Sequence, residues 1–333
     1  MSAHRAGRRP LARVIIGAVA SLVTVAVALA LAAAGFVTHI ANTYQGRTTT
    51  IAQAFPSGSR PSQNAHGALN VLLLGSDSRA QLDPDGDHAA GGRSDTMMVL
   101  HIAADRRSVS VMSILRDSWV DVPGHGMAKI NAAYSWGGVP LTVQTVEGLL
   151  GLHIDHVAEI DFAGFAGMTD ALGGVDVRSD QAFTARGHRF TAGVNHLDGD
   201  AALAFVRERY AFTDADRQRV RNQQAFLRGI ADTVTDRGTL TSPSRISGFV
   251  GAMSEHLSVD SGLTARRLAT LGWELRGLRT SEIGFFTLPA PGGGTSADGQ
   301  SYVVVDQEAL GSIRQALAAD TLPQYLAATA GGL

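Results

Sequence analysis

Arginines are concentrated between residues 207 and 221, with a spacing that could serve to bind an anion. Arg207 and Arg209 are two residues apart, so both side chains project to the same side of an extended backbone. With a step of about 100° per residue along a helix expected at 214–236, Arg219 and Gln223 lie near its apolar side. Because a buried arginine without a partner is unfavourable, Arg219 needs either a phosphate or a structural carboxylate, and both stay open here.

Charged side chains also stand at the ends of three expected strands. Asp77 follows a short apolar run, Arg93 and Asp95 precede the next run, and Arg116 follows a third. Ligands of α/β sheets commonly bind beyond the carboxyl ends of strands. Two aspartates at adjacent strand ends could share one hard cation through oxygen ligands. The competing interpretations are an aspartate that caps a turn and a weak surface pair of Arg116 with Asp117.

A third polar group surrounds Lys129, the only lysine in the chain. Gly137 and Gly138 come directly before a helix expected at 138–150. Their backbone N–H groups could bind an anion, or the two glycines could simply form a flexible cap. The sequence favours neither interpretation.

The elements that must position these residues alternate between strands and helices, which predicts an α-β-α sandwich with a mixed central sheet. The expected strands are 70–74, 97–102, 109–115, 282–287 and 301–305, and the other expected helices are 162–172, 199–206, 243–256, 263–277 and 306–318.

An apolar segment without charges covers residues 14–37, and four arginines precede it. It is long enough to cross a bilayer as a helix, and the positive-inside tendency places residues 1–13 in the cytoplasm. A cleaved signal peptide is the alternative, but the run is long for a signal core. Residues 38–68 are polar and are interpreted as an extracytoplasmic tether, followed by a catalytic domain at 69–325. With a formal net charge of −2, the chain has no general attraction for nucleic acid.

In their order and spacing, these motifs resemble the LytR-CpsA-Psr family from about residue 69 to residue 228. The matching runs are Asn70–Arg79, Arg93–Thr96, Ser113–Asp117, Lys129–Tyr134, Asp161–Phe165, Leu172–Asp176 and Leu197–Gly199, then the pair Arg207 and Arg209, and Arg219 with Gln223 and Gln224. No single run is specific for this family, but the whole set in this order is. The acidic segment between Asp77 and Asp95 is an insertion whose length varies in the family, so the spacing between these two aspartates is not a fixed feature of the resemblance.

The resemblance implies a hydrophobic groove for a polyprenyl chain, beside a site for its pyrophosphate. The residues implied for the pyrophosphate are Arg93, Arg116, Lys129, Arg207, Arg209, Arg219 and Gln223. Asp77 and Asp95 are the implied ligands of a magnesium ion, and together with Arg116 and Arg219 they are the catalytic candidates.

The implied reaction is a Mg-dependent phosphotransfer from a polyprenyl-pyrophosphate-linked glycan donor to a peptidoglycan acceptor, outside a membrane in which the chain is anchored by a single pass. Arabinogalactan is one candidate polymer, because the preference for arginine indicates a high-GC bacterium. Three other functions compete: a pyrophosphatase that uses the same residues, a membrane-bound transcriptional regulator, and a non-catalytic lipid-binding protein or scaffold.

Overall fold

A mixed β-sheet lies at the centre of the computed structural model, which describes residues 31–76, 94–214, 216–235 and 242–329. In spatial order its strands are β1 (Thr49–Thr50), β12 (Leu257–Val259), β7 (His156–Asp161), β2 (Leu69–Ser76), β3 (Ser94–Ile102), β4 (Val109–Ile114) and β13 (Ile283–Thr287). β2, β3 and β4 are antiparallel neighbours, whereas β7 and β13 join the sheet in parallel to β2 and β4. The mixed sheet predicted from the sequence is confirmed.

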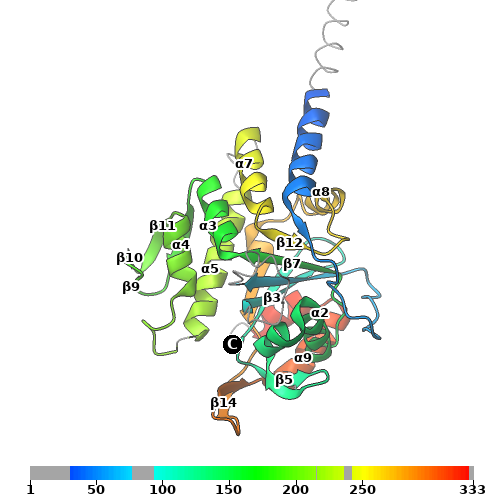
Figure 1. The fold of residues 1–333 in the computed structure, drawn as a ribbon, viewed down its shortest axis with the longest axis vertical. Coiled ribbons are helices and arrows are strands. Elements are labelled where there is room, and N and C mark those ends of the chain that lie inside the picture. The colour runs from blue at the N-terminus through cyan, green and yellow to red at the C-terminus, as the bar shows by residue number, and fades with distance from the viewer. Residues whose placement is uncertain (1–30, 77–93, 215, 236–241, 330–333) are drawn as a thin grey trace, which may run out of the picture.

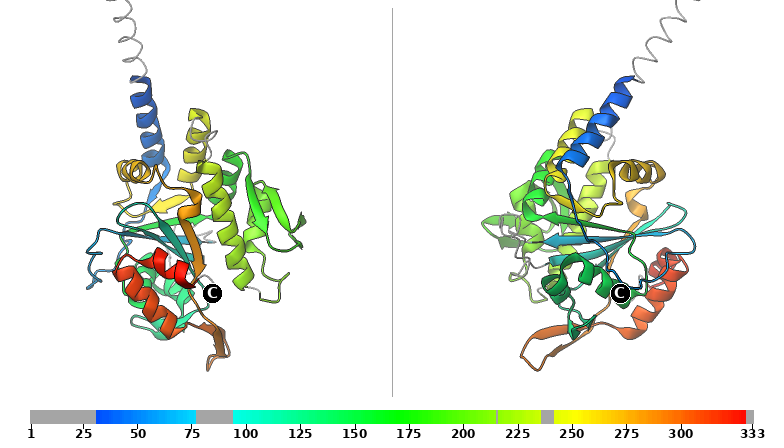
Figure 2. Two further views of the ribbon diagram at one scale, coloured as in Figure 1. Left: turned by 180° about the vertical axis from the view of Figure 1, so that it is seen from behind. Right: turned by 45° about the vertical axis from the view of Figure 1, so that its right-hand side comes forward.

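Helices cover both faces of this sheet (Figures 1 and 2). One layer contains α2 (Ile130–Leu150), α9 (Gln307–Ala318) and α10 (Leu322–Thr329). The other layer contains α3 (Phe162–Ala171), α4 (Gly199–Arg207), α5 (Asp216–Thr235), α7 (Pro243–Ser254) and α8 (Ala265–Glu274), with a 3-10 turn, η2 (Thr280–Glu282), before β13. Side chains of β2 and β3 alternate between the layers: Leu72 and Val99 pack under α2 and α9, while Leu73 and Leu100 point to the other side.

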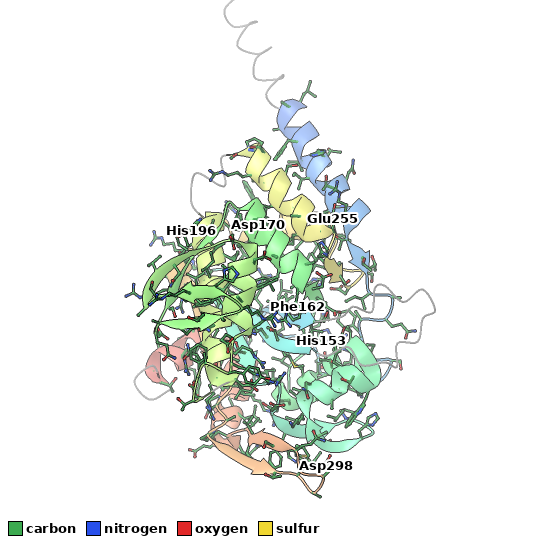
Figure 3. The ribbon with its side chains drawn as sticks, turned by 60° about the vertical axis from the view of Figure 1, so that its left-hand side comes forward. His153, Phe162, Asp170, His196, Glu255 and Asp298 are labelled. Atoms are coloured by element: carbon green, nitrogen blue, oxygen red, sulfur yellow. The ribbon has the colours of Figure 1, made fainter. Side chains whose placement is uncertain are left out.

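The described part of the chain also contains four two-stranded sheets. They pair β5 (Trp119–Val122) with β6 (Gly126–Lys129), β8 (Val175–Ser179) with β11 (Gly193–Leu197), β9 (Phe183–Ala185) with β10 (His188–Phe190), and β14 (Gly292–Thr295) with β15 (Ser301–Val304). The β14–β15 hairpin projects from the end of the molecule opposite the helix at 31–47, and Asp298 lies near its tip (Figure 3).

The stretch labelled α2 begins at Ile130, but the backbone of Gly137 and Gly138 is not helical, so residues 139–150 form a helical segment close to the range that the sequence predicts. Gly137 and Gly138 form a kink inside α2, with a φ of 60° and a ψ of −151° at Gly138. Neither glycine lines the large cavity described below. The two glycines therefore separate two helical segments and do not contact the cavity.

Residues 38–68 differ from the expected tether, because much of the segment packs on the domain. Tyr44 is buried and its hydroxyl donates a hydrogen bond to the carbonyl of Leu263 at 2.7 Å. Arg60 forms an ion pair with the buried Glu147 at 2.7 Å. Aromatic and charged side chains in this stretch find partners on the domain, which its overall polarity does not predict.

The predicted span at 14–37 lies mostly outside the described residues, and its last part belongs to a helix that covers residues 31–47. In the described part of the chain, no helix combines the length and the apolar character that crossing a membrane requires. Leu31 and Val37 are exposed on this helix.

Candidate active site

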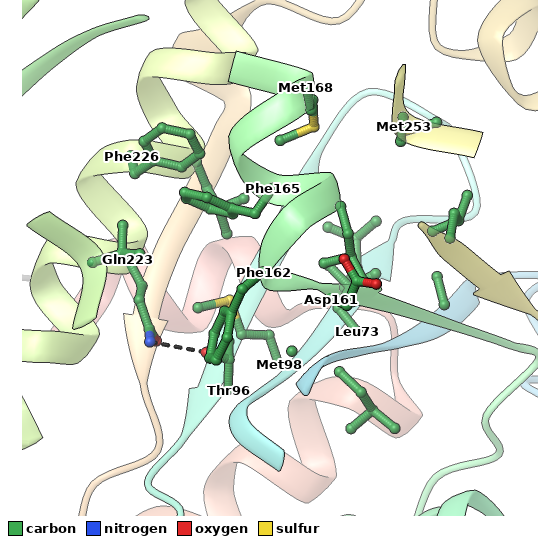
Figure 4. A pocket seen from close by; sticks show the side chains of 18 of the residues that line it. Leu73, Thr96, Met98, Asp161, Phe162, Phe165, Met168, Gln223, Phe226 and Met253 are labelled. Carbon is green, nitrogen blue, oxygen red and sulfur yellow. Dashed lines mark hydrogen bonds between the residues drawn. The ribbon is translucent and has the colours of Figure 1, made fainter. Parts of the chain in front are cut away.

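A cavity of about 740 Å³ lies between one face of the sheet and the helices α3, α5, α7 and α8. Protein interiors rarely contain voids larger than a water molecule, so a cavity of this size indicates a ligand site. Figure 4 shows it lined by side chains of β2 and β3 and by aromatic residues of α3 and α5. Its apolar lining includes Leu73, Met98, Leu100, Phe165, Met168, Phe226, Met253, Leu268 and Leu271.

Strand β3 runs along the length of this cavity. Thr96, Met98, Leu100 and Ile102 all line it, since alternate residues of a strand share one face. At about 3.3 Å per residue, this stretch extends about 20 Å. Helix α8 lines the apolar end. The space is therefore long and apolar, which suits a hydrocarbon chain.

Five arginines line the cavity. Four of them lie at its other end, and we call them the arginine mouth: Arg116, Arg207, Arg209 and Arg219. They come from the end of β4, the last residue of α4, the following loop and the first turns of α5. β4 is antiparallel to β3, so Arg116 lies beside the start of β3. Two stretches of the chain that are far apart in sequence, one at Arg116 and one from Arg207 to Arg219, thus place guanidinium groups around one opening.

Gln223 lines the cavity next to the arginine mouth, one helical turn after Arg219. Its Nε2 donates a hydrogen bond to Oγ1 of Thr96 at 2.9 Å (Figure 4). The neighbouring Gln224 instead donates to Ser113 and to the carbonyl of Phe286, at 2.9 and 3.0 Å. Gln223 is therefore placed at the opening, whereas Gln224 fixes α5 to the sheet.

Asp216, the first residue of α5, contacts three members of the arginine mouth. Its carboxylate lies 3.2 Å from Arg219, 3.4 Å from Arg116 and 3.8 Å from Arg209. Arg219 is 5% exposed, so this pairing explains how its charge is tolerated in the interior. A structural carboxylate, one of the two partners that the sequence allows for Arg219, is therefore present. Because a guanidinium group carries five N–H donors, pairing with a carboxylate does not exclude an anion as a second partner.

A second carboxylate, Asp117, shares Arg116 with Asp216. Burial raises the pKa of Asp117, although Arg116 at 3.7 Å and Lys129 at 3.3 Å oppose this effect. Burial also disfavours the charge of Asp216, but Arg219 and Arg116 outweigh it and hold the pKa of Asp216 below its usual value. Asp216 is thus the acid that stays ionised, and Asp117 is the first of the pair to accept a proton. Lys129 belongs to this cluster through Asp117 but does not line the cavity.

Aromatic rings orient two of the arginines. The guanidinium group of Arg207 lies over the ring of Phe162 at 4.0 Å, and that of Arg209 lies over the ring of Tyr210 at 4.6 Å. Stacking on a ring holds the plane of a guanidinium group in one orientation, and a planar guanidinium group matches the oxygens of a phosphate in bidentate contacts. This part of the mouth is therefore suited to binding phosphate oxygens.

Three of the predicted site residues cannot be placed in this geometry. Asp77 and Arg93 lie outside the described residues, and only the backbone of Asp95 is described. The register of β2 with β3 shifts here, since Gly75 pairs with Thr96 and Ser76 with Ser94. Asp95 is therefore the extra residue of a β-bulge, a feature that often re-aims side chains beside active sites. Among the described side chains, no group of three or more acidic or histidine residues could hold a metal.

Sequence reasoning did not select Asp216, Phe162 or Arg186 for the site. Arg186 lines the cavity from the β9–β10 turn, where its φ is 48°. The one available signal was the position of Asp216, three residues before Arg219 at a helix start. Phe162 lies in the matching run Asp161–Phe165, but neither its residue type nor its spacing indicates that it reaches the cavity. Arg186 lies in none of the matching runs.

Comparisons with known proteins agree with one another. The model of the LytR_cpsA_psr family matches residues 35–319. The probable cell wall biosynthesis protein LcpB of Corynebacterium glutamicum is 40% identical over 217 residues, which cover 62% of this chain and 52% of LcpB. The polyisoprenyl-teichoic acid–peptidoglycan teichoic acid transferase TagU of Enterococcus faecalis is 31% identical over 250 residues, which cover 75% of this chain and 78% of TagU. The match thus spans about half the length of LcpB and most of TagU.

The fold is also similar to that of a solved structure. The crystal structure of TagV from B. subtilis superposes with a TM-score of 0.65 and 25% sequence identity, covering 77% of this chain and 98% of TagV.

Proposed function

The chain belongs to the LytR-CpsA-Psr family, and from this premise we propose that it attaches a lipid-carried glycopolymer to peptidoglycan. The observation that carries the proposal is a single cavity with two chemically different ends. One end is long and apolar, and the other carries the arginine mouth. A polyprenyl pyrophosphate has the same two parts, a hydrocarbon chain and a diphosphate. TagU, named as a polyisoprenyl-teichoic acid–peptidoglycan teichoic acid transferase, supports this class of substrate.

In the proposed reaction, a peptidoglycan hydroxyl attacks the phosphorus that carries the glycan. A new phosphate ester forms, the P–O–P bond breaks, polyprenyl phosphate leaves, and the hydroxyl proton passes to a base. Arg116, Arg207, Arg209 and Arg219 would hold both phosphates in line and stabilise the charge on the leaving group. The apolar cavity would keep the leaving polyprenyl chain bound and oriented, which lowers the entropic cost of reaching the reactive geometry.

Magnesium is part of the proposal, with Asp77 and Asp95 as the residues that would hold it. The register of β2 with β3 supports this pair, because Asp95 stands in the bulge opposite the end of β2, and Asp77 follows Ser76 in sequence. When bound, the ion would supply positive charge to the phosphate oxygens. Removal of divalent cations with a chelator should abolish transfer, and added Mg²⁺ should restore it. Full activity in the chelator would refute this part.

We also propose that residues 14–37 cross the membrane once, with residues 1–13 in the cytoplasm and the domain outside. Proteolysis of intact and permeabilised cells tests this topology, since a domain on the outer side is digested in both. Protection of the domain in cell-wall-stripped but intact cells would contradict it.

The central experiment measures transfer by the purified full chain, with a polyprenyl-pyrophosphate-linked glycan as donor and peptidoglycan as acceptor. Arg219→Ala should reduce transfer by about 100-fold or more, because it removes a donor aimed at developing phosphate charge. Arg228→Ala is the matched control, since Arg228 is exposed on the same helix and stacks on Phe285. Normal transfer by a folded Arg219→Ala protein would refute the site. Product analysis separates transfer from hydrolysis, because a pyrophosphatase would release free phospho-glycan with or without acceptor.

A further inference from the structure

Helix α8 separates the apolar end of the cavity from the surroundings. Leu268 and Leu271 line the cavity on its inner side. Gly272 also lines the cavity and is exposed, and a Cβ added there would meet no atom within 4 Å. The cavity therefore reaches the molecular surface at α8, at the end opposite the arginine mouth.

The outer side of α8 is both aromatic and basic. Trp273 is 69% exposed, and the guanidinium group of Arg276 lies 4.2 Å from the centre of its ring. Arg266 is exposed two turns before Trp273, at a spacing that places both on one face of the helix. The nearest acid on this helix, Glu274, turns away to pair with Arg106 at 2.8 Å. Exposed tryptophan beside arginine is typical of side chains that lie at a lipid headgroup layer.

The position of α8 relative to the N-terminal helix favours the same partner. In Figures 1 and 2 it lies across the base of the helix at 31–47. Tyr44 of that helix bonds to Leu263, just before α8. His39 contacts Ser247 of α7 at 3.3 Å, which holds the N-terminal helix against the domain.

The proposed span ends at Val37, so simple helix geometry gives the height of α8 above the bilayer. Seven residues at 1.5 Å place Tyr44 about 10 Å from Val37 along the axis. Subtracting a helix radius of about 5 Å leaves the side of α8 nearest the proposed span about 5 Å from the hydrocarbon boundary. The headgroup layer is about 5–7 Å thick on each side. Side chains on the side of α8 nearest the proposed span thus lie at headgroup depth.

We propose that α8 docks on an anionic lipid surface through Trp273, Arg266 and Arg276, so that the cavity opening at Gly272 faces the lipid. This inference rests on the proposed membrane anchor and lipid-carried donor. Docking in this way lets a hydrocarbon chain pass from the bilayer into the cavity without crossing water. The negative headgroups match the arginines, which would be drawn less to neutral lipid.

The test uses the full chain in vesicles of phosphatidylglycerol and phosphatidylcholine whose acyl chains are brominated close to the headgroup, which quenches nearby tryptophan fluorescence. The wild-type protein should be quenched, and Trp273→Phe should lose most of this quenching. Trp136→Phe is the matched control, because Trp136 is 50% exposed on α2, in the opposite layer, and its removal should leave the quenching in place. Equal quenching of wild type and Trp273→Phe would overturn the proposal.

A second measurement separates this inference from the proposed function. The double variant Arg266→Glu and Arg276→Glu should lose several-fold in transfer from a long-chain donor in anionic vesicles, and should keep wild-type transfer from a short-chain donor in detergent. An unchanged rate in vesicles would overturn docking. A wild-type protein inactive in detergent with every donor would instead count against the proposed function, while the quenching result would still decide the docking.

Discussion

Asp216 brings three arginines together, and removing its charge tests whether that arrangement matters for catalysis. Asp216→Asn keeps the shape of the side chain but takes away the common partner of Arg116, Arg209 and Arg219. We expect transfer to fall about 100-fold, since small displacements of positioning groups are costly in rate. Asp214→Asn is the control, because Asp214 is exposed and pairs with Arg221 outside the cavity. Equal rates for both variants in the transfer assay would mean that Asp216 serves stability alone.

The proton on Asp117 should make binding of the donor depend on pH. Its pKa is raised by burial, so it gains a proton at a higher pH than an ordinary aspartate. As the pH falls through that pKa, Asp117 loses the charge that occupies Arg116 and Lys129, and a diphosphate should bind more tightly. Titration calorimetry with geranyl pyrophosphate over a pH series measures this. Asp117→Asn should bind tightly across the series, and an identical pH profile in both proteins would refute the assignment.

Most of the arginine mouth could be predicted from the residues themselves. Arg219 and Gln223 were separated from the solvated face of α5 by helical periodicity, and Arg116 by its position after a strand. Asp216 was not, because a helix-start aspartate is usually a cap, and only the folded chain shows which arginines surround it. The carboxylate and the phosphate considered as alternative partners of Arg219 do not exclude each other, since one guanidinium group can contact both an aspartate and a phosphate.

The kink in α2 yields a prediction at the level of a single element. Gly138 has a φ of 60° and a ψ of −151°, a region that is essentially restricted to glycine. Gly138→Ala should therefore lower the free energy of unfolding by about 1–3 kcal/mol. Gly148→Ala in the same helix should instead raise it by about 0.5–1 kcal/mol, because that site is open and has no positive φ. Urea unfolding of both variants measures the difference, and a stabilised Gly138→Ala protein would contradict the role of the kink.

The elements predicted well from the sequence are those whose apolar residues follow a clear strand or helix periodicity. β2, β3 and β4 and the helices from α3 to α9 lie close to their expected ranges. The two-stranded pairs β5–β6, β8–β11 and β9–β10 were missed, as were β7 and β12 of the central sheet. Most of these strands are short, and β7 contains His156, Glu159 and Asp161, so it is not an apolar run. The packing of residues 38–68 was missed for a different reason: a few anchoring side chains, such as Tyr44, outweigh a polar composition.

At the scale of the whole molecule, the cavity is a passage between two ends with different chemistry, and β3 gives its length. Leu100 lies four residues from Thr96, about 13 Å from the arginine mouth. Leu100→Trp should fill the cavity at that depth and leave the mouth unchanged. Transfer from a donor with a long polyprenyl chain should then fall at least about 10-fold, while a donor with one or two isoprene units should react at the wild-type rate. Leu100→Met conserves side-chain volume and should leave both rates unchanged.

Rates with the two donors, measured side by side, decide between an elongated lipid site and a site that recognises only the diphosphate. Equal loss with both donors, or no loss with either, would show that the polyprenyl chain does not lie along β3.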